Sequence, residues 1–371
     1  MFSYNKIDEY QIEITTYCNA VCPQCPRNNN GHGINELMPL IHLSDDVINT
    51  TFDKELTARL RQVFFCGSYG DPIMHPNFLK ILRDFRSKNP TLWLYMHTNG
   101  GVHDVDYWQE IAKIMNGYGQ IDFGIDGLSD TLHLYRRNVK FEKVIENACA
   151  YINAGGRAQW NFIVFKHNEH QVEEAKQLSK DLGFFNILVR KTGRFFNHRT
   201  IEEMPNWPVA KQSYVLEPPN NIEYRNNSML DLPTIKQNYP NIRDYFNTTD
   251  INCDALLGNK VVITAEGLVL PCNFFNHNLY DKRFYFKNIL PEANELSFID
   301  NQNQIRVFLE KYRLEKLNIK NYSLKEIFSN QMWTDLINSW NKELHNGRLF
   351  ECAMTCGTKI KKVWDQQEKI K

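Results

Sequence analysis

The sequence predicts an α/β protein: a partial (β/α)6 barrel of the TIM type followed by a small α+β domain. Short runs rich in β-branched and aromatic residues alternate with longer helix-like segments, and the alternation repeats about six times. This order favours parallel strands joined by right-handed crossovers, and six units suit an open barrel better than a complete eight-fold one. A later hairpin pattern, followed by helical sequence and further cysteines, predicts the second domain.

The predicted strands and helices alternate through the first half of the chain. The strands are expected at residues 10–15, 61–66, 92–97, 120–125, 158–165 and 185–190, and the helices at 45–60, 76–88, 105–117, 139–153 and 169–182. In the C-terminal part, a hairpin is expected at residues 260–270 with Gly267 in its turn, and a helix over 324–347 ending at Gly347.

These patterns divide the chain into three parts. We assign residues 1–195 to the barrel, 196–250 to a linker or to loops that cover the barrel mouth, and 251–371 to the second domain. The middle part is rich in Asn and Pro, which favour loops.

Composition narrows the class of protein. The chain has 371 residues, 42% of them hydrophobic, which is enough for a large core and about two domains. Lys+Arg and Asp+Glu both number 43, and no long basic run is present, so nucleic acid is not the expected partner. No apolar run approaches the ~20 residues of a membrane span, and the first residues lack a secretory pattern. We therefore expect no membrane partner and a cytoplasmic location.

Cysteine spacing is the strongest signal in the sequence. The nine cysteines would stay reduced in the cytoplasm, where short fixed spacings indicate metal ligands rather than disulfides. Cys18, Cys22 and Cys25 form a C-x-x-x-C-x-x-C triplet directly after the first predicted strand. Three thiolates can hold three corners of an iron–sulfur cubane and leave the fourth iron open, as a catalytic centre requires. A zinc knuckle closed by a distant fourth ligand is the alternative.

The triplet, its position after the first strand, and the preceding residues 13–17 (EITTY) resemble the radical S-adenosylmethionine (SAM) superfamily. The resemblance covers roughly residues 10–190. It implies that the open iron chelates the amino and carboxylate groups of SAM. It also implies that the reduced [4Fe-4S] cluster cleaves SAM to methionine and a 5'-deoxyadenosyl radical, which removes a hydrogen atom from the substrate.

A segment after the second predicted strand resembles the Gly-Gly-Glu-Pro segment of that family. Tyr69 stands in place of the first Gly, Gly70 matches the second, and Asp71 stands in place of the Glu. The resemblance implies that this segment binds the methionine amino group of SAM, here with a carboxylate that is one methylene shorter.

Two further segments follow the next strands in the family's order. Asn99, within Thr-Asn-Gly, and Asp126, within Ile-Asp-Gly, resemble family segments that bind the cofactor, with Gly124 replacing a Ser. Gln24 replaces an aromatic residue that many members carry beside the third cysteine. That position meets adenine through its backbone, so the resemblance still implies a cofactor contact.

Polar residues that follow the fourth predicted strand are further candidates. His133, Tyr135, Arg136 and Arg137 are suited to binding the ribose or carboxylate of SAM, or an anionic substrate, because arginine recognises carboxylates in a bidentate manner. We take Arg137 as the cofactor-binding candidate. A solvated surface is the alternative reading.

Cys66, near the end of the second predicted strand, is the one candidate for a catalytic residue. A thiol near the radical can donate a hydrogen atom, as an epimerisation requires. An inert buried thiol is the alternative. His97 and Asn168 are expected to face the barrel mouth from strand register, without an assigned role.

Four cysteines follow the barrel: Cys253, Cys272, Cys352 and Cys356. The first two bracket the predicted hairpin, and this arrangement resembles the opening of the SPASM and twitch domains that follow many radical SAM barrels. Four cysteines suit one further [4Fe-4S] cluster. Because four thiolates saturate such a cluster, the resemblance implies electron transfer rather than substrate binding. A structural zinc ion is the alternative.

The resemblance to twitch-bearing dehydrogenases predicts oxidation of a small polar substrate, such as a sugar or aminocyclitol alcohol, with a reductase or flavodoxin-type electron donor. The first cysteine comes too early for a preceding peptide-recognition domain, so a small molecule is favoured over a peptide. The rival functions are a peptide- or protein-modifying enzyme and a redox-neutral epimerase that uses Cys66. From other classes, an iron–sulfur electron carrier and a zinc-stabilised binding module stay open.

Overall fold

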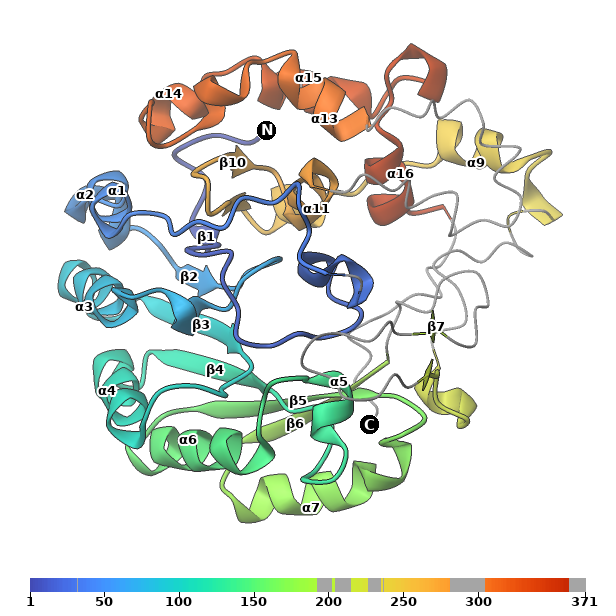
Figure 1. Ribbon diagram of the computed structural model, residues 1–371. Helices are drawn as coiled ribbons and strands as arrows, with labels where there is room; N and C mark the ends of the chain where they lie inside the picture. The colour runs from blue at the N-terminus through green and yellow to red at the C-terminus, as the bar shows by residue number, and fades with distance from the viewer. Residues whose placement is uncertain are drawn as a thin grey trace.

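The computed structural model describes residues 1–31, 33–191, 202–203, 215–225, 235, 237–280 and 304–359. Its centre is an eight-stranded sheet in the order β10-β9-β1-β2-β3-β4-β5-β6 (Figure 1). The strands of this sheet are β1 (Glu9–Ile12), β2 (Gln62–Phe65), β3 (Trp93–Thr98), β4 (Gly119–Gly124), β5 (Ala158–Val164), β6 (Asn186–Lys191), β9 (Lys260–Ile263) and β10 (Val269–Leu270). A separate two-stranded sheet pairs β7 (Glu202–Glu203) with β8 (Val215–Leu216).

Helices connect and cover these strands. The α-helices are α1 (Asp45–Thr51), α2 (Lys54–Ala58), α3 (Phe78–Lys88), α4 (Val105–Met115), α5 (Leu132–Tyr135), α6 (Phe141–Asn153), α7 (Val172–Asp181), α9 (Ile242–Thr248), α10 (Asp254–Leu257), α11 (Asn273–Leu279), α13 (Gln304–Glu310), α14 (Leu324–Phe328), α15 (Met332–Ser339) and α16 (Phe350–Cys356). Short 3-10 helices are η1 (Pro26–Gly31), η2 (Pro72–Met74), η3 (Glu169–Gln171), η5 (Ile222–Tyr224), η6 (Leu314–Leu317) and η7 (Leu344–Asn346).

The predicted partial barrel is confirmed. All six predicted strands are present, and β1 to β6 pair in parallel, each with the next in the sequence. Figure 1 shows α3, α4 and α6 along one side of these strands. Each helix buries one apolar face: α3, for example, buries Phe78, Ile81, Leu82 and Phe85. Parallel strands carry all their carboxyl ends to one edge, where the functional loops gather.

The predicted hairpin is also present, but it continues the barrel sheet. Strand β9 pairs in parallel with β1, in register Tyr10 to Val261, and β10 pairs antiparallel with β9. The hairpin therefore covers the edge of β1 that would otherwise expose unpaired backbone groups. Gly267 has φ +93°, and a Cβ atom there would lie 2.6 Å from Asn318 Oδ1, so the turn requires glycine.

Three predicted helices are wrong in their continuity. Residues 45–60 form α1 and α2, because the Asp53 side chain accepts from the Leu56 backbone N–H and begins a new helix. Residues 169–182 begin as the 3-10 turn η3 before α7.

Residues 324–347 form α14, α15 and η7 instead of one helix. Between α14 and α15, the Ser329 hydroxyl donates to the Glu326 carbonyl, and the Asn330 side chain accepts from the Met332 N–H. Such side-chain bonds to the backbone compete with helix continuation.

The C-terminal helices pack back on the start of the chain, where the Phe2 and Trp333 ring centroids lie 5.1 Å apart. The predicted linker at 196–250 falls mostly outside the described residues, which within it are 202–203, 215–225, 235 and 237–250. The three-part division of the chain stays a prediction. Among the described residues, no helix has both the length and the apolar character needed to cross a bilayer.

Candidate active site

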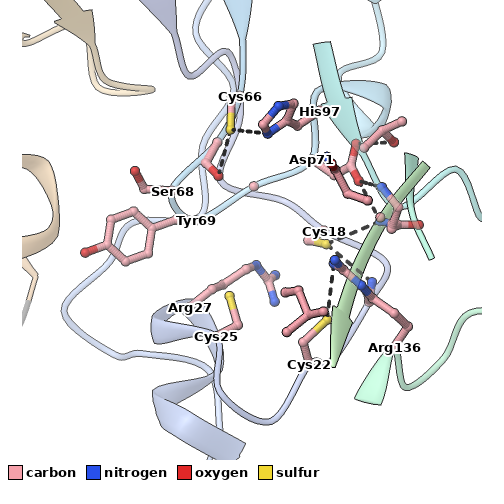
Figure 2. A pocket seen from close by; sticks show the side chains of 18 of the residues that line it. Cys18, Cys22, Cys25, Arg27, Cys66, Ser68, Tyr69, Asp71, His97 and Arg136 are labelled. Carbon is pink, nitrogen blue, oxygen red and sulfur yellow. Dashed lines mark hydrogen bonds between the residues drawn. The ribbon is translucent and has the colours of Figure 1, made fainter. Parts of the chain in front are cut away.

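A cavity of about 290 Å³ lies at the carboxyl ends of β1 to β6. Side chains and loops from all six strands contribute to it, and Figure 2 shows the three cysteines of the first loop facing Cys66 and His97 across it. The residues used below that line it are Cys18, Cys22, Cys25, Arg27, Cys66, Tyr69, Gly70, Asp71, His97, Asn99, Asp122, Gly124, Arg136, Asn161 and Arg190. The four predicted loop segments therefore meet at one place.

Backbone hydrogen bonds fix the cysteine loop against the barrel. The Cys25 N–H donates to the Cys22 carbonyl at 3.1 Å, and the Val21 N–H donates to the Arg137 carbonyl at 3.0 Å. Arg27, which sequence reasoning missed, donates from Nε to the Thr16 carbonyl at 2.9 Å while it lines the cavity. The three sulfur atoms are thus held toward one space.

Two thiols of this loop, Cys18 and Cys22, disfavour the thiolate form in the protein alone. Burial raises the pKa of Cys22 to about 11, although Arg136 lies close and its Nη1 is 3.8 Å from Sγ. Burial, followed by the charges of Asp71 and the other two cysteines, raises the pKa of Cys18 well above its ordinary value. A positively charged metal cluster would displace these protons and relieve the repulsion, so this donor set fits three corners of an iron–sulfur cluster.

Asp71 joins the second and third segments. Its buried carboxylate accepts hydrogen bonds from Thr98 Oγ1 at 2.8 Å, and from Asn99 N and Nδ2 at 2.8 and 2.6 Å. Burial raises the pKa of Asp71, and these hydrogen bonds oppose that rise. Asn99 Nδ2 also lies 3.8 Å from Cys18 Sγ. The Gly-Asp-Pro and Thr-Asn-Gly segments therefore form one rigid wall beside the cysteines.

Close backbone approach explains Gly70. A Cβ atom at Gly70 would lie 1.9 Å from the Thr15 carbonyl oxygen, so only glycine lets this loop pass the backbone that follows β1. Glu13, which sequence reasoning also missed, holds the same loop: Oε1 accepts from the Tyr69 N–H at 2.6 Å, and Oε2 from Asn276 Nδ2 at 2.9 Å. Burial raises the pKa of Glu13 to about 7.

The Tyr69 side chain points away from the cysteines, as Figure 2 shows. Its hydroxyl donates to the His277 carbonyl at 3.0 Å, and its ring packs edge-on against Tyr280. Tyr69 thus anchors the loop on α11, and its contact with the cofactor stays a prediction.

Asp126 orients an arginine toward the cavity. Its Oδ2 accepts from Arg136 Nε at 2.6 Å, and its Oδ1 from the Ile163 N–H at 2.7 Å. A Cβ atom at Gly124 would lie 2.4 Å from Arg136 Nη2, which explains the glycine at this position. Arg136 lines the cavity, whereas Arg137, the residue chosen from the sequence, is buried outside the lining. Gln24 is also buried outside the lining.

The far side of the cavity is polar, with Cys66, His97 and Asp122 in contact. Cys66 Sγ lies 3.7 Å from His97 Nδ1, and His97 Nε2 lies 3.2 Å from Asp122 Oδ2. Burial alone would raise the pKa of Asp122, but hydrogen bonds from His97, Tyr95 and Gln120 lower it to about 2. Burial raises the pKa of Cys66 to about 12, so this thiol stays neutral.

Asp122 was missed from the sequence, and a signal for it exists. Gln120 and Asp122 alternate with apolar residues along β4, which places both on the inner face of the barrel. A polar pair at such positions is unusual for a barrel core.

The four later cysteines also meet. Cys253 and Cys272 directly precede α10 and α11, and Cys352 and Cys356 lie on α16. All four line one small cavity of about 20 Å³. A hydrogen bond with Cys356 lowers the pKa of Cys253, and burial raises that of Cys272 to about 12. Among the described residues, no three His, Cys, Asp or Glu side chains are arranged around a single metal ion. Four converging thiols nevertheless supply a complete soft donor set for a cluster.

The chain resembles known proteins in part of its sequence and in its fold. Residues 12–178 match the model of the radical SAM superfamily, and no curated protein matches the chain. Among solved structures, anSMEcpe with bound AdoMet is 16% identical, with a TM-score of 0.51 over 90% of this chain and 80% of that chain. Streptococcus suis SuiB bound to precursor peptide SuiA is 13% identical, with a TM-score of 0.50 over 94% and 76%.

BtrN in complex with AdoMet and 2-DOIA is 14% identical, with a TM-score of 0.42 over 95% of this chain and 94% of that chain. At such identities the first two likenesses concern the fold alone, and they agree with the partial barrel. The family match implies SAM and a [4Fe-4S] cluster, which suit the three cysteines and the polar wall beside them. Residues 12–178 of this chain thus form a radical SAM domain.

Proposed function

We propose that this enzyme oxidises an alcohol carbon of a small polar substrate, such as a sugar or aminocyclitol, to a carbonyl. The observation that carries the proposal is the polar side of the cavity, where His97, Asp122 and Asn161 face the three cysteines. A hydroxylated substrate can form hydrogen bonds with polar groups on this side of the cavity, which an apolar substrate cannot do.

In this proposal Cys18, Cys22 and Cys25 hold the catalytic cluster. When bound, the cluster and SAM supply a 5'-deoxyadenosyl radical. Asp71, Asn99 and the backbone at Tyr69 and Gly70 form the wall for the methionine part of SAM. Gln24, through its backbone, and Asp126 are assigned to the nucleoside part, and Arg136 takes the carboxylate role that the sequence suggested for Arg137.

We assign the second cysteine set to a further [4Fe-4S] cluster that accepts an electron from the substrate radical. A direct connection supports this role: Asn273, next to Cys272, donates from Nδ2 to Gln11 Oε1 at 2.7 Å. Gln11 Nε2 in turn donates to the Cys66 carbonyl at 3.1 Å, at the cavity. The two sites are therefore linked through one short hydrogen-bonded path.

A cytoplasmic setting suits the proposal, because reduced thiols are needed to assemble both clusters. A reductase or flavodoxin-type protein would deliver the electron that starts each turnover.

The test starts from anaerobically purified protein. We expect about eight irons per chain, SAM cleavage, and a carbonyl product from at least one member of a panel of sugar and aminocyclitol alcohols. Replacing Cys18, Cys22 and Cys25 together by Ala should abolish SAM cleavage, while Cys149→Ala on α6 serves as the matched control. Unchanged cleavage in the triple variant, or a protein that contains zinc and no iron, would refute the proposal.

Redox-neutral epimerisation is the second candidate, favoured by the neutral Cys66 thiol in the cavity. In D2O an epimerase would place one solvent deuterium on the product carbon, through exchange of the S–H hydrogen, and Cys66→Ser would abolish this. Alcohol oxidation places none there. A peptide- or protein-modifying function is tested by offering peptides to the same enzyme and analysing them for modification.

A further inference from the structure

One buried carboxylate organises the inner face of the barrel. Asp122 Oδ2 accepts hydrogen bonds from Tyr95 Oη at 2.6 Å, from Gln159 Nε2 at 2.8 Å and from Asn161 Nδ2 at 3.0 Å. His97 Nε2 lies 3.2 Å from the same oxygen. Strand pairing sets this arrangement, because His97 on β3 is in register with Asp122 on β4. Asp122 is therefore an anion with a fixed position.

The hydrogen bonds around Asp122 determine which nitrogen of His97 carries the proton. Tyr95 Oη lies 2.6 Å from both Asp122 Oδ2 and His97 Nε2, and its hydroxyl has one hydrogen. If that hydrogen pointed to His97, two oxygens would face each other at 2.6 Å with no hydrogen between them. The hydroxyl must donate to Asp122, so Nε2 must be the donor to Tyr95.

Nδ1 is then the basic nitrogen of the neutral ring. It faces the cavity side, where its neighbour is Cys66 Sγ at 3.7 Å. A thiol is a weak donor, so a substrate hydroxyl that reaches Nδ1 replaces it at little cost. The partly exposed His97 side chain, 30% accessible, leaves room for this contact.

We propose that His97 Nδ1 is the base that takes the hydroxyl proton of the substrate, with Asp122 and Tyr95 as positioning residues. The inference rests on the proposed alcohol oxidation. The substrate loses its carbinol hydrogen atom to the SAM-derived radical, its O–H proton to Nδ1, and one electron to the second iron–sulfur cluster. These three losses convert C–OH to C=O, and the Asp122 anion stabilises the imidazolium that forms.

The tautomer is tested without any substrate. In holoprotein labelled with 15N-histidine and held at a pH where the ring is neutral, NMR should show His97 protonated at Nε2. The His97→Gln variant assigns the signal by removing it, and His170→Gln, at an exposed site on η3, should leave it in place. Protonation at Nδ1 in the parent protein would overturn the inference.

The proton-acceptor role is tested with the alcohol panel deuterated at the carbinol carbon. His97→Gln should still pass deuterium to 5'-deoxyadenosine within about twofold of the parent, while carbonyl formed per 5'-deoxyadenosine falls at least about tenfold. Glutamine keeps a polar group near Asp122 but has no basic nitrogen.

The outcomes separate the two claims. A parent enzyme that cleaves SAM and oxidises no alcohol overturns the proposed function. A parent that oxidises an alcohol, with an equal carbonyl yield after His97→Gln, overturns the role of His97 alone. Loss of deuterium transfer in that variant would also overturn it, because His97 would then act in binding or folding.

Discussion

At the residue scale, the polar side of the cavity depends on Asp122, whose five hydrogen-bond neighbours come from three strands. A single atom change there reverses the direction of one hydrogen bond without changing the shape of the side chain. Because asparagine is also neutral, the ring of His97 loses the negative charge beside it. A substitution of Asp122 by Asn can therefore test the chemical role of this side chain without changing its packing.

We predict that Asp122→Asn lowers carbonyl yield by about 10²-fold and leaves substrate-free SAM cleavage unchanged. Asparagine is neutral, so it no longer stabilises the imidazolium that forms when His97 Nδ1 takes the substrate proton. Carbonyl and 5'-deoxyadenosine are quantified in parallel, with the exposed Asp181→Asn as control. A yield equal to that of the parent would contradict the prediction.

Gly70 offers a test of backbone crowding. In Gly70→Ala the new methyl group would meet the Thr15 carbonyl, so the loop must move, and we expect a loss of about 1–3 kcal/mol in unfolding free energy together with slower SAM cleavage. Urea denaturation and cleavage assays measure the two effects. Gly117→Ala is the control. Gly117, unlike Gly70, has positive φ, but an added Cβ meets nothing within 4 Å, so we expect about 1 kcal/mol of backbone strain and normal SAM cleavage.

At the element scale, α11 holds the barrel loops in place. Asn273 binds Gln11 on β1, and Asn276 binds Glu13, directly after β1. The His277 carbonyl accepts from Tyr69 in the loop of residues 67–70. Since Cys272 directly precedes this helix, a cluster bound there would brace the same loop that forms the wall of the proposed SAM site. The hairpin and α11 together couple the second cysteine set to the first.

Glu13, which binds Asn276 on α11, makes the stability of the protein dependent on pH. Burial raises its pKa to about 7 from an ordinary 4.5, so between these values the folded protein holds a proton that the unfolded chain has released. The contribution to stability is complete below pH 4.5 and is lost as pH rises through 7. We predict that the unfolding free energy of Glu13→Gln, relative to that of the parent, rises by up to about 3 kcal/mol as the pH is raised from 5 to 8. Exposed Glu142→Gln should show no such trend in the same urea titrations, and a flat difference for Glu13→Gln would contradict the prediction.

At the scale of the whole molecule, the features that could be predicted from the sequence are those whose residues lie close together in the chain. Each of these features depends on a few consecutive residues. They are the strands of the barrel, the cysteine triplet, and the loops at Asp71, Asn99 and Asp126. Other features depend on contacts between segments that are distant in the chain, and the spacing of residues does not predict such contacts. They are the pairing of β9 with β1, the position of Arg136 rather than Arg137 at the cavity, and the hydrogen bonds of Asp122. The break between α14 and α15 depended on two side-chain bonds that a periodic pattern hides.

The second cysteine set provides the test of the whole architecture. Cys253 and Cys352 come from opposite ends of the C-terminal part, and both face the cavity shared with Cys272 and Cys356. We predict that Cys253→Ala or Cys352→Ala loses about four irons per chain, since three thiolates hold a cluster less firmly than four, and spares substrate-free SAM cleavage. Carbonyl formation should fall, because the substrate radical then lacks its electron acceptor.

Iron, sulfide and zinc are quantified for both variants and for Cys149→Ala. Iron content equal to that of the parent in both would exclude the second cluster, whereas loss of one zinc would identify the site as structural and would require another route for the electron.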